Sequence, residues 1–120
     1  MNAAAFRRGD AITRLENYAP VIVEHLALVA WFPTHTANNH WQAELRGFLG
    51  ALKRYDSAKS GRHNFTKEIV IMTLMDMIRT EDERDYVLIG VESHGGSVPS
   101  EPDWDLVYKS IEDFALKLVK

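Results

Sequence analysis

The chain of 120 residues contains no cysteine. A disulfide scaffold, a thiolate zinc site, an iron–sulfur cluster and a cysteine nucleophile are therefore all excluded. The chain also lacks a long hydrophobic run, because its most apolar stretch, residues 21–32, is interrupted by Glu24 and His25. A membrane-spanning helix needs about 20 apolar residues, and residues 1–10 lack the apolar segment of a secretory signal. We therefore expect a cytoplasmic protein without a membrane segment.

Common motifs of catalytic and phosphate-binding sites are missing as well. The sequence has no GxGxxG, GxxxxGK[ST], HExxH or GxSxG pattern. Gly95 and Gly96 follow an expected helix, whereas a phosphate-binding loop precedes one, so we interpret them as a helix stop. The acidic clusters at residues 81–85 and 101–105 are interpreted as the first turns of helices, where acids are stabilising. No residue is predicted to be catalytic, and no cofactor is expected.

Apolar residues recur at helical spacing along almost the whole chain. The pattern is clearest in residues 41–55 and 104–118, where one apolar stripe follows each expected helix. We therefore predict an all-α fold, with residues 1–120 forming a single compact domain of five or six helices. The expected arrangement is a multilayered or orthogonal bundle, or a short stack of helix pairs. Residues 1–9 are expected to form a disordered N-terminal tail.

Several residues in the first half predict where helices begin and end. Pro20 predicts either a break or the first turn of a new helix, and Pro33 predicts the end of the helix before it. The side chain of Asn38 or Asn39 is expected to cap the start of the next helix. Residues 56–64 are polar and predict an exposed loop.

In the second half, residues 65–79 carry apolar side chains at most positions, which predicts a core helix enclosed by others. Thr80 and Glu83 match the capping box that opens a helix. The composition of residues 86–91 also suits a strand, but the capping box and the lack of a partner strand favour a helix. Ser100 is expected to cap the last helix.

The net charge of −3 gives no general attraction to nucleic acid or to an anionic membrane, but the charges are unevenly distributed. Residues 42–67 contain six basic and two acidic residues, whereas residues 81–120 contain ten acidic and four basic ones. The basic stretch includes the candidate interaction residues Arg54, Lys59 and Arg62. Phosphate contacts by this stretch would make the protein a nucleic-acid binder. The acidic stretch instead predicts a basic protein partner.

Four residues are candidates for a metal site. Glu24 and His25 lie in an apolar expected helix, and His35 and His40 lie just beyond its end. Helical bundles hold divalent metals with histidines and carboxylates from facing helices, so a metal-binding bundle, or a metal-dependent enzyme, is one alternative. Their spacing does not match a helical metal motif. The simpler interpretation is that His25 is a hydrogen-bonded core histidine.

Trp31 and Trp41 flank the connection after Pro33, and such aromatic residues are candidate anchors of an interface. The two oppositely charged stretches can also attract each other within one fold or across a homodimer. Together these observations favour a non-enzymatic protein-interaction or regulatory module that binds a protein partner or a second copy. The metal-binding bundle and the nucleic-acid binder are the alternatives.

Overall fold

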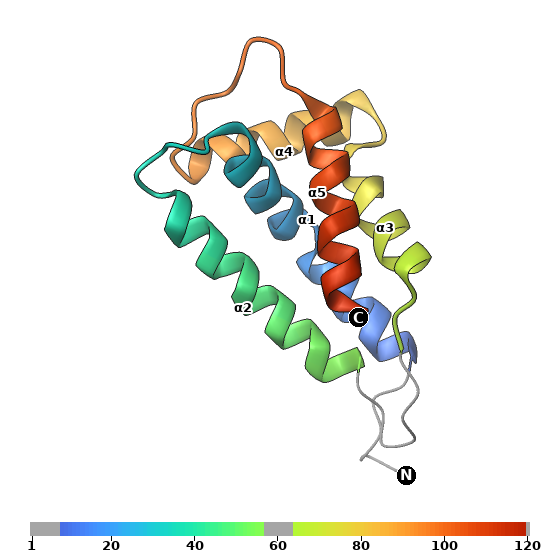
Figure 1. The fold of residues 1–120 in the computed structure, drawn as a ribbon. Coiled ribbons are helices and arrows are strands. Elements are labelled where there is room, and N and C mark those ends of the chain that lie inside the picture. The colour runs from blue at the N-terminus through green and yellow to red at the C-terminus, as the bar shows by residue number, and fades with distance from the viewer. Residues whose placement is uncertain (1–7, 57–63, 120) are drawn as a thin grey trace.

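The computed structural model describes residues 8–56 and 64–119, and every regular element in this part of the chain is helical (Figure 1). The elements are α1 (Arg8–Trp31), α2 (Asn38–Asp56), α3 (Lys67–Met75), the 3₁₀ turn η1 (Asp76–Ile78), α4 (Glu81–Ser93) and α5 (Trp104–Leu118). The predicted all-α bundle is confirmed. None of these helices is long and apolar enough to cross a bilayer. Because α1 begins at Arg8, residues 8 and 9 belong to a helix and not to a tail, and residues 1–7 lie outside the described residues.

The long helix α1 is the centre of the bundle, because it packs against each of the other helices. In Figure 1, α2 and α5 flank α1, α3 lies beside α5, and α4 crosses near the C-terminal end of α1. Both ends of α1 contribute fully buried side chains, such as Leu15 and Leu28. The other helices cover them with a second set of buried residues: Trp41, Leu52, Val70, Leu74, Ile78, Val87, Val91, Val107, Ile111 and Phe114.

The structure contradicts the expectation for Pro20, because α1 continues through this residue without a break or a new helix. Proline cannot donate the helical hydrogen bond to the carbonyl group of Glu16. Both residues are exposed, so water can solvate that carbonyl group in place of the missing donor. Meanwhile Ala19 and Ile22 continue the buried face across the proline. The predicted helix end before Pro33 is confirmed, since α1 ends at Trp31.

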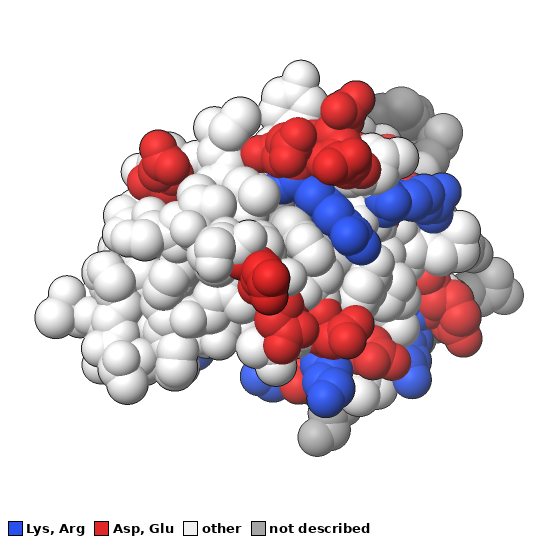
Figure 2. All heavy atoms as spheres, turned by 90° about the horizontal axis from the view of Figure 1, so that it is seen from above, with Lys and Arg blue, Asp and Glu red and all other residues white. Residues whose placement is uncertain are grey.

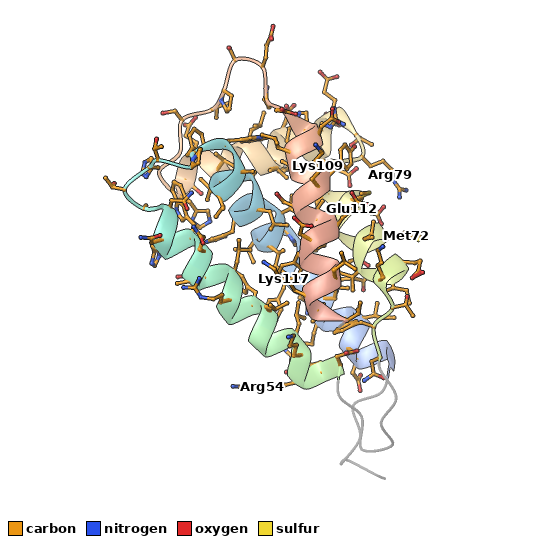
Figure 3. The ribbon with its side chains drawn as sticks, viewed as in Figure 1. Arg54, Met72, Arg79, Lys109, Glu112 and Lys117 are labelled. Atoms are coloured by element: carbon orange, nitrogen blue, oxygen red, sulfur yellow. The ribbon has the colours of Figure 1, made fainter. Side chains whose placement is uncertain are left out.

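The prediction that residues 65–79 form an enclosed core helix is wrong. Only three residues of α3 and η1, Val70, Leu74 and Ile78, are fully buried. Met72 is 60% exposed and points away from the bundle (Figure 3). The reason is tertiary, since α3 lies at the edge of the bundle, where α1 and α5 cover only its inner side.

The ends of α4 confirm the local predictions. Thr80 and Glu83 form the capping box. The Thr80 hydroxyl accepts a hydrogen bond from the backbone N–H of Glu83, and the Glu83 carboxylate accepts one from the backbone N–H of Thr80. Residues 86–91 are helical, and Gly95 takes a positive φ of 99° just after the helix end, which favours glycine.

The last helix is capped by Asp103 and not by Ser100, so the predicted cap is wrong. The Asp103 carboxylate accepts from the backbone N–H groups of Asp105 and Leu106. Pro102 explains the difference, because the residue before a proline is disfavoured in the helical conformation, so a helix starting after Ser100 is blocked there.

The predicted loop 56–64 is described only at its two ends, which are buried and not exposed as expected. The carboxylate of Asp56 accepts a hydrogen bond of 2.7 Å from the backbone N–H of Phe65, and the side chain of Asn64 donates to the carbonyl oxygen of Tyr55 at 2.7 Å. These bonds hold Asn64 and Phe65, which lie just before α3, against the last residues of α2. Residues 57–63 lie outside the described residues.

Candidate functional site

Two of the predicted metal ligands, Glu24 and His25, lie against the C-terminal end of α4. The Nε2 atom of His94 is 3.3 Å from Oε1 of Glu24, and the His94 ring centroid is 4.7 Å from that of His25. Nδ1 of His25 donates to the carbonyl oxygen of Val21 at 2.8 Å. A Cβ atom on Gly90 would overlap the Glu24 side chain, so this close approach of α1 and α4 depends on a glycine.

The other two predicted ligands have different surroundings. His40 is exposed, and its Nε2 lies 3.3 Å from Oε1 of Glu44 on the same helix. His35 accepts a hydrogen bond of 3.0 Å from the backbone N–H of Ala37, and its ring packs on Trp41 at 4.7 Å. Within residues 8–56 and 64–119, no group of three or more histidines and carboxylates is arranged to hold a metal ion. The four residues therefore do not assemble into one donor set there.

His25, His40 and His94 nevertheless line one solvent-open hollow of about 400 Å³. Burial lowers the pKa of His25, because apolar surroundings favour the neutral imidazole. The backbone hydrogen bond of its ring and nearby Glu44 act in the opposite direction, whereas His94 and His40 lower the pKa further. Burial also raises the pKa of Glu24, against the opposing effect of His94.

We expect the free energy of unfolding to fall when the pH is lowered from about 7.5 to about 5.5. In the unfolded chain His25 has its ordinary pKa of about 6.5, whereas its pKa in the folded chain is lower. The unfolded chain therefore binds more protons in this window. This stabilisation is complete above about pH 6.5 and is lost as the pH falls through the folded-state pKa.

The raised pKa of Glu24 acts with the opposite sign, because protonated Glu24 favours the folded state. That contribution is complete below about pH 4.5 and is lost as the pH rises through the raised pKa. Urea titrations followed by circular dichroism at several pH values separate the two groups when wild type is compared with His25→Gln. The variant cannot take up the proton, so its stability should change less with pH. An equally steep profile in the variant would show that His25 is not the responsible group.

The two tryptophans proposed as interface anchors have internal partners. Trp41 is only 2% exposed and belongs to the core. Trp31 is half-buried; its indole Nε1 donates to the carbonyl oxygen of Asp103 at 2.9 Å, and its ring packs edge-on against Trp104 at 5.1 Å. These contacts tie the end of α1 to the start of α5. Both side chains are therefore engaged within the fold.

Of the three candidate basic residues, only Arg54 is described. It is exposed and extends from the last turns of α2 into solvent (Figure 3). Lys59 and Arg62 lie outside the described residues. Arg54 is therefore the one of these three candidates whose position the structure gives.

The outer face of α4 is another candidate surface, which the sequence patterns did not indicate. Tyr86 and Ile89 lie there one turn apart, and their side chains are 73% and 65% exposed. At helical spacing the same face carries Asp82, Asp85 and Glu92, all exposed. Figure 2 looks down on the end of the molecule at which α4 lies and shows groups of acidic side chains, several with basic side chains beside them, separated by wide uncharged surface. We call these five residues the α4 outer face.

Two apolar hollows adjoin this face. The first, of about 420 Å³, is lined by Pro20, Glu24, Met77, Glu83, Tyr86 and Val87. The second, of about 290 Å³, is lined by Asp85, Leu88, Ile89, Glu92 and Val98. Every charged residue that lines either hollow is a carboxylate. Each hollow therefore joins an exposed apolar side chain to two acidic groups.

The single basic residue of α4, Arg84, turns away from this face. Its Nε atom donates to the carbonyl oxygen of Ile78 at 2.9 Å, and its guanidinium group donates to the Tyr108 hydroxyl at 3.2 Å. The same group lies over the Trp104 ring, 5.2 Å from the centroid, in a cation–π contact. The guanidinium group of Arg84, which the sequence places among the acids of α4, therefore makes its contacts on the inner side of the helix and not on the outer face.

The available sequence signal for this face was the excess of apolar residues in α4. Val87 and Val91 already supply a buried stripe, so Tyr86 and Ile89 fall outside it on a helical projection. The acids at residues 81–85 were explained by the helix N-terminus alone. That explanation accounts for the first turn but not for Glu92 at the other end.

Comparisons with protein-family models, with curated proteins and with solved structures give no match to this chain.

Proposed function

We propose that the protein is a non-enzymatic protein-interaction module whose α4 outer face binds a basic, amphipathic segment of a partner protein. The observation that carries this function is that two exposed apolar side chains adjoin hollows whose charged lining is entirely acidic. We retain the sequence-based expectation that the module acts in the cytoplasm.

Tyr86 and Ile89 are the expected anchors of the interface. Aromatic and large aliphatic side chains supply most of the binding energy when they enter or border a pocket that excludes water. Both are more than half exposed in the isolated chain, so a partner can still remove much of their surface from water. Each borders one of the two hollows, which can receive apolar side chains of the partner.

The carboxylates define the chemistry of that partner. Asp85 and Glu92 border the hollow beside Ile89, so lysine or arginine side chains on either side of an inserted apolar residue would meet an opposite charge. Arg84 does not compensate these acids, because its guanidinium group is held on the inner side of α4. Such complementary charges speed association and disfavour acidic partners, and their effect weakens with salt.

Binding to a fluorescent amphipathic peptide of leucine and lysine tests this function by anisotropy, with a leucine and glutamate peptide of the same pattern as the negative probe. We expect Ile89→Ala or Tyr86→Ala to weaken binding of the lysine peptide by about tenfold. Leu116→Ala is the matched control, because Leu116 is also an exposed aliphatic residue but lies on α5. It should leave the affinity unchanged.

A second pair of variants separates a specific site from general attraction by an acidic protein. Asp85→Asn should weaken binding more than Glu112→Gln, although both remove one exposed negative charge, because only Asp85 lines a hollow of the α4 outer face. Equal effects of the two variants would show that binding depends only on the net charge of the protein and would contradict the proposed function.

A second copy of the chain is the alternative occupant of this face. Sedimentation velocity at several concentrations measures self-association directly. If a dimer forms and Ile89→Ala abolishes it, the partner is a second copy and the separate basic protein is ruled out as the required occupant. A monomer at all concentrations keeps the basic partner as the proposed ligand.

A further inference from the structure

A further hollow, with a different chemistry, lies between α2 and α5, and it is independent of the α4 outer face. These two helices flank α1 and leave a groove of about 420 Å³ between them. Its lining is Leu26, Val29, Gln42, Leu45, Arg46, Leu49, Ser110, Asp113, Phe114 and Lys117. Leu26 and Phe114 are buried, and the other three apolar residues are half-buried. The groove therefore has an apolar interior that α2 and α5 do not cover.

The charged groups of the groove are Arg46 on α2 and Lys117 and Asp113 on α5. Among residues 8–56 and 64–119, neither cation has a carboxylate within ion-pair distance or a side-chain hydrogen bond. Figure 3 places Lys117 on the side of α5 that faces α2. Two cations and one acid thus border an apolar surface, the reverse of the acidic lining on α4.

We propose that this groove binds a free, single-chain amphipathic anion, an aliphatic chain that ends in a carboxylate. The chain lies along the apolar interior, and the carboxylate lies between Arg46 and Lys117, whose donors match its oxygens. A volume of about 420 Å³ falls within the usual range for small-molecule sites. This volume is roughly that of a single turn of an α-helix of about 10 Å diameter. A partner helix several turns long therefore fits the groove less well than an extended alkyl chain.

Calorimetric titration with octanoate, decanoate and dodecanoate, each below its micelle concentration, tests the apolar part. Each added methylene is expected to tighten binding about fourfold until the groove is full, which corresponds to about 0.8 kcal/mol of burial. Affinity that does not increase with chain length would overturn the proposed site. Dodecyltrimethylammonium has the same chain with a cationic head, and it should bind more weakly than dodecanoate. Equal affinity for the two would also overturn the site.

Variants then locate the carboxylate. Arg46→Gln and Lys117→Gln should each weaken dodecanoate binding about two- to fivefold, the range of a solvent-exposed ion pair. Arg54→Gln is the matched control, because Arg54 is an exposed cation of the same helix α2 that does not line the groove. An effect of Arg54→Gln equal to that of Arg46→Gln would show that only net charge matters and would rule the site out.

Filling the groove is the most direct test. Ser110→Phe and Gln42→Phe introduce a large side chain from opposite walls, and either one should reduce dodecanoate affinity more than tenfold while circular dichroism confirms the fold. Two variants are used because one of them can fail to fold. Undiminished binding by a folded variant would refute the groove as the binding site. Binding to anionic lipid vesicles without binding to free dodecanoate would refute it as well.

Discussion

Replacing Trp41 by alanine is expected to lower the free energy of unfolding by about 3–5 kcal/mol, the usual cost of truncating a large buried aromatic residue. Trp41 is 2% exposed. Its ring lies 4.7 Å from that of His35 and 6.4 Å from that of Phe32, so one side chain joins the end of α1, the following connection and the start of α2. The cavity left by its removal would reach all three segments.

Urea unfolding followed by far-ultraviolet circular dichroism measures this effect without relying on tryptophan fluorescence, which the substitution itself changes. Arg54→Ala is the control, since Arg54 lies on the same helix but is exposed, and its loss should change stability by no more than about 0.5 kcal/mol. A loss below about 1 kcal/mol for Trp41→Ala would mean that this residue is not part of the packed core.

Asn38→Ala is expected to cost about 2–3 kcal/mol. The Asn38 amide donates to the carbonyl oxygens of Val29 at 3.3 Å and of Phe32 at 2.9 Å, and its own oxygen accepts from Gln42 at 2.6 Å. Its removal takes away three hydrogen bonds of about 1 kcal/mol each and leaves carbonyl groups at the end of α1 without this donor. Asn38 thus caps the end of α1 from the first turn of α2.

Asn39→Ala is the matched control, because Asn39 is adjacent and of the same residue type but exposed. Its substitution should change the unfolding midpoint in urea only slightly. If Asn38→Ala and Asn39→Ala have the same effect, the buried amide does not hold the two helices together. The prediction that the side chain of Asn38 or Asn39 caps the start of α2 is wrong. The helix begins at Asn38 itself, and the Asn38 amide instead donates to carbonyl groups at the end of α1.

The features that were predicted correctly depend on neighbours within a few residues. The capping box of Thr80 and Glu83 and the glycine at residue 95 act within one or two turns of α4, so their effect can be recognised without knowledge of the fold. The same is true of Pro33 after the end of α1. The all-α class followed from the apolar spacing along the whole chain.

Two of the errors, at Pro20 and in residues 65–79, concern the packing of one segment against others. Pro20 leaves the Glu16 carbonyl group without its helical donor, and both residues are exposed because the rest of the bundle packs on the other side of α1. Which side of α1 faces water is a property of the bundle. Similarly, the uniform apolar composition of residues 65–79 does not reveal that α3 lies at an edge and leaves Met72 exposed. The spacing of apolar residues shows which faces of a helix are apolar, but it does not show whether another helix packs against each of those faces.

The candidate site was also only partly accessible from the sequence. Glu24 and His25 were identified as unusual residues in an apolar helix, but their neighbour His94 lies 69 residues after His25 in the sequence and reaches it only through the crossing of α4 over α1. The two hollows beside the α4 outer face likewise combine α4 with residues from α1, η1 and the connection after α4. No local pattern contains such combinations.

The contacts of Arg84 have a consequence for the energetics of recognition. Its bonds to Ile78 and Tyr108 and its stacking on Trp104 join α4 to η1 and α5, so the helix is clamped from behind while its outer side is free to receive a ligand. A clamped helix loses little conformational entropy when a partner docks. Tyr86 and Ile89 are therefore presented on a preorganised platform, and loosening it through Arg84→Ala would weaken binding without removing a single contact to the partner.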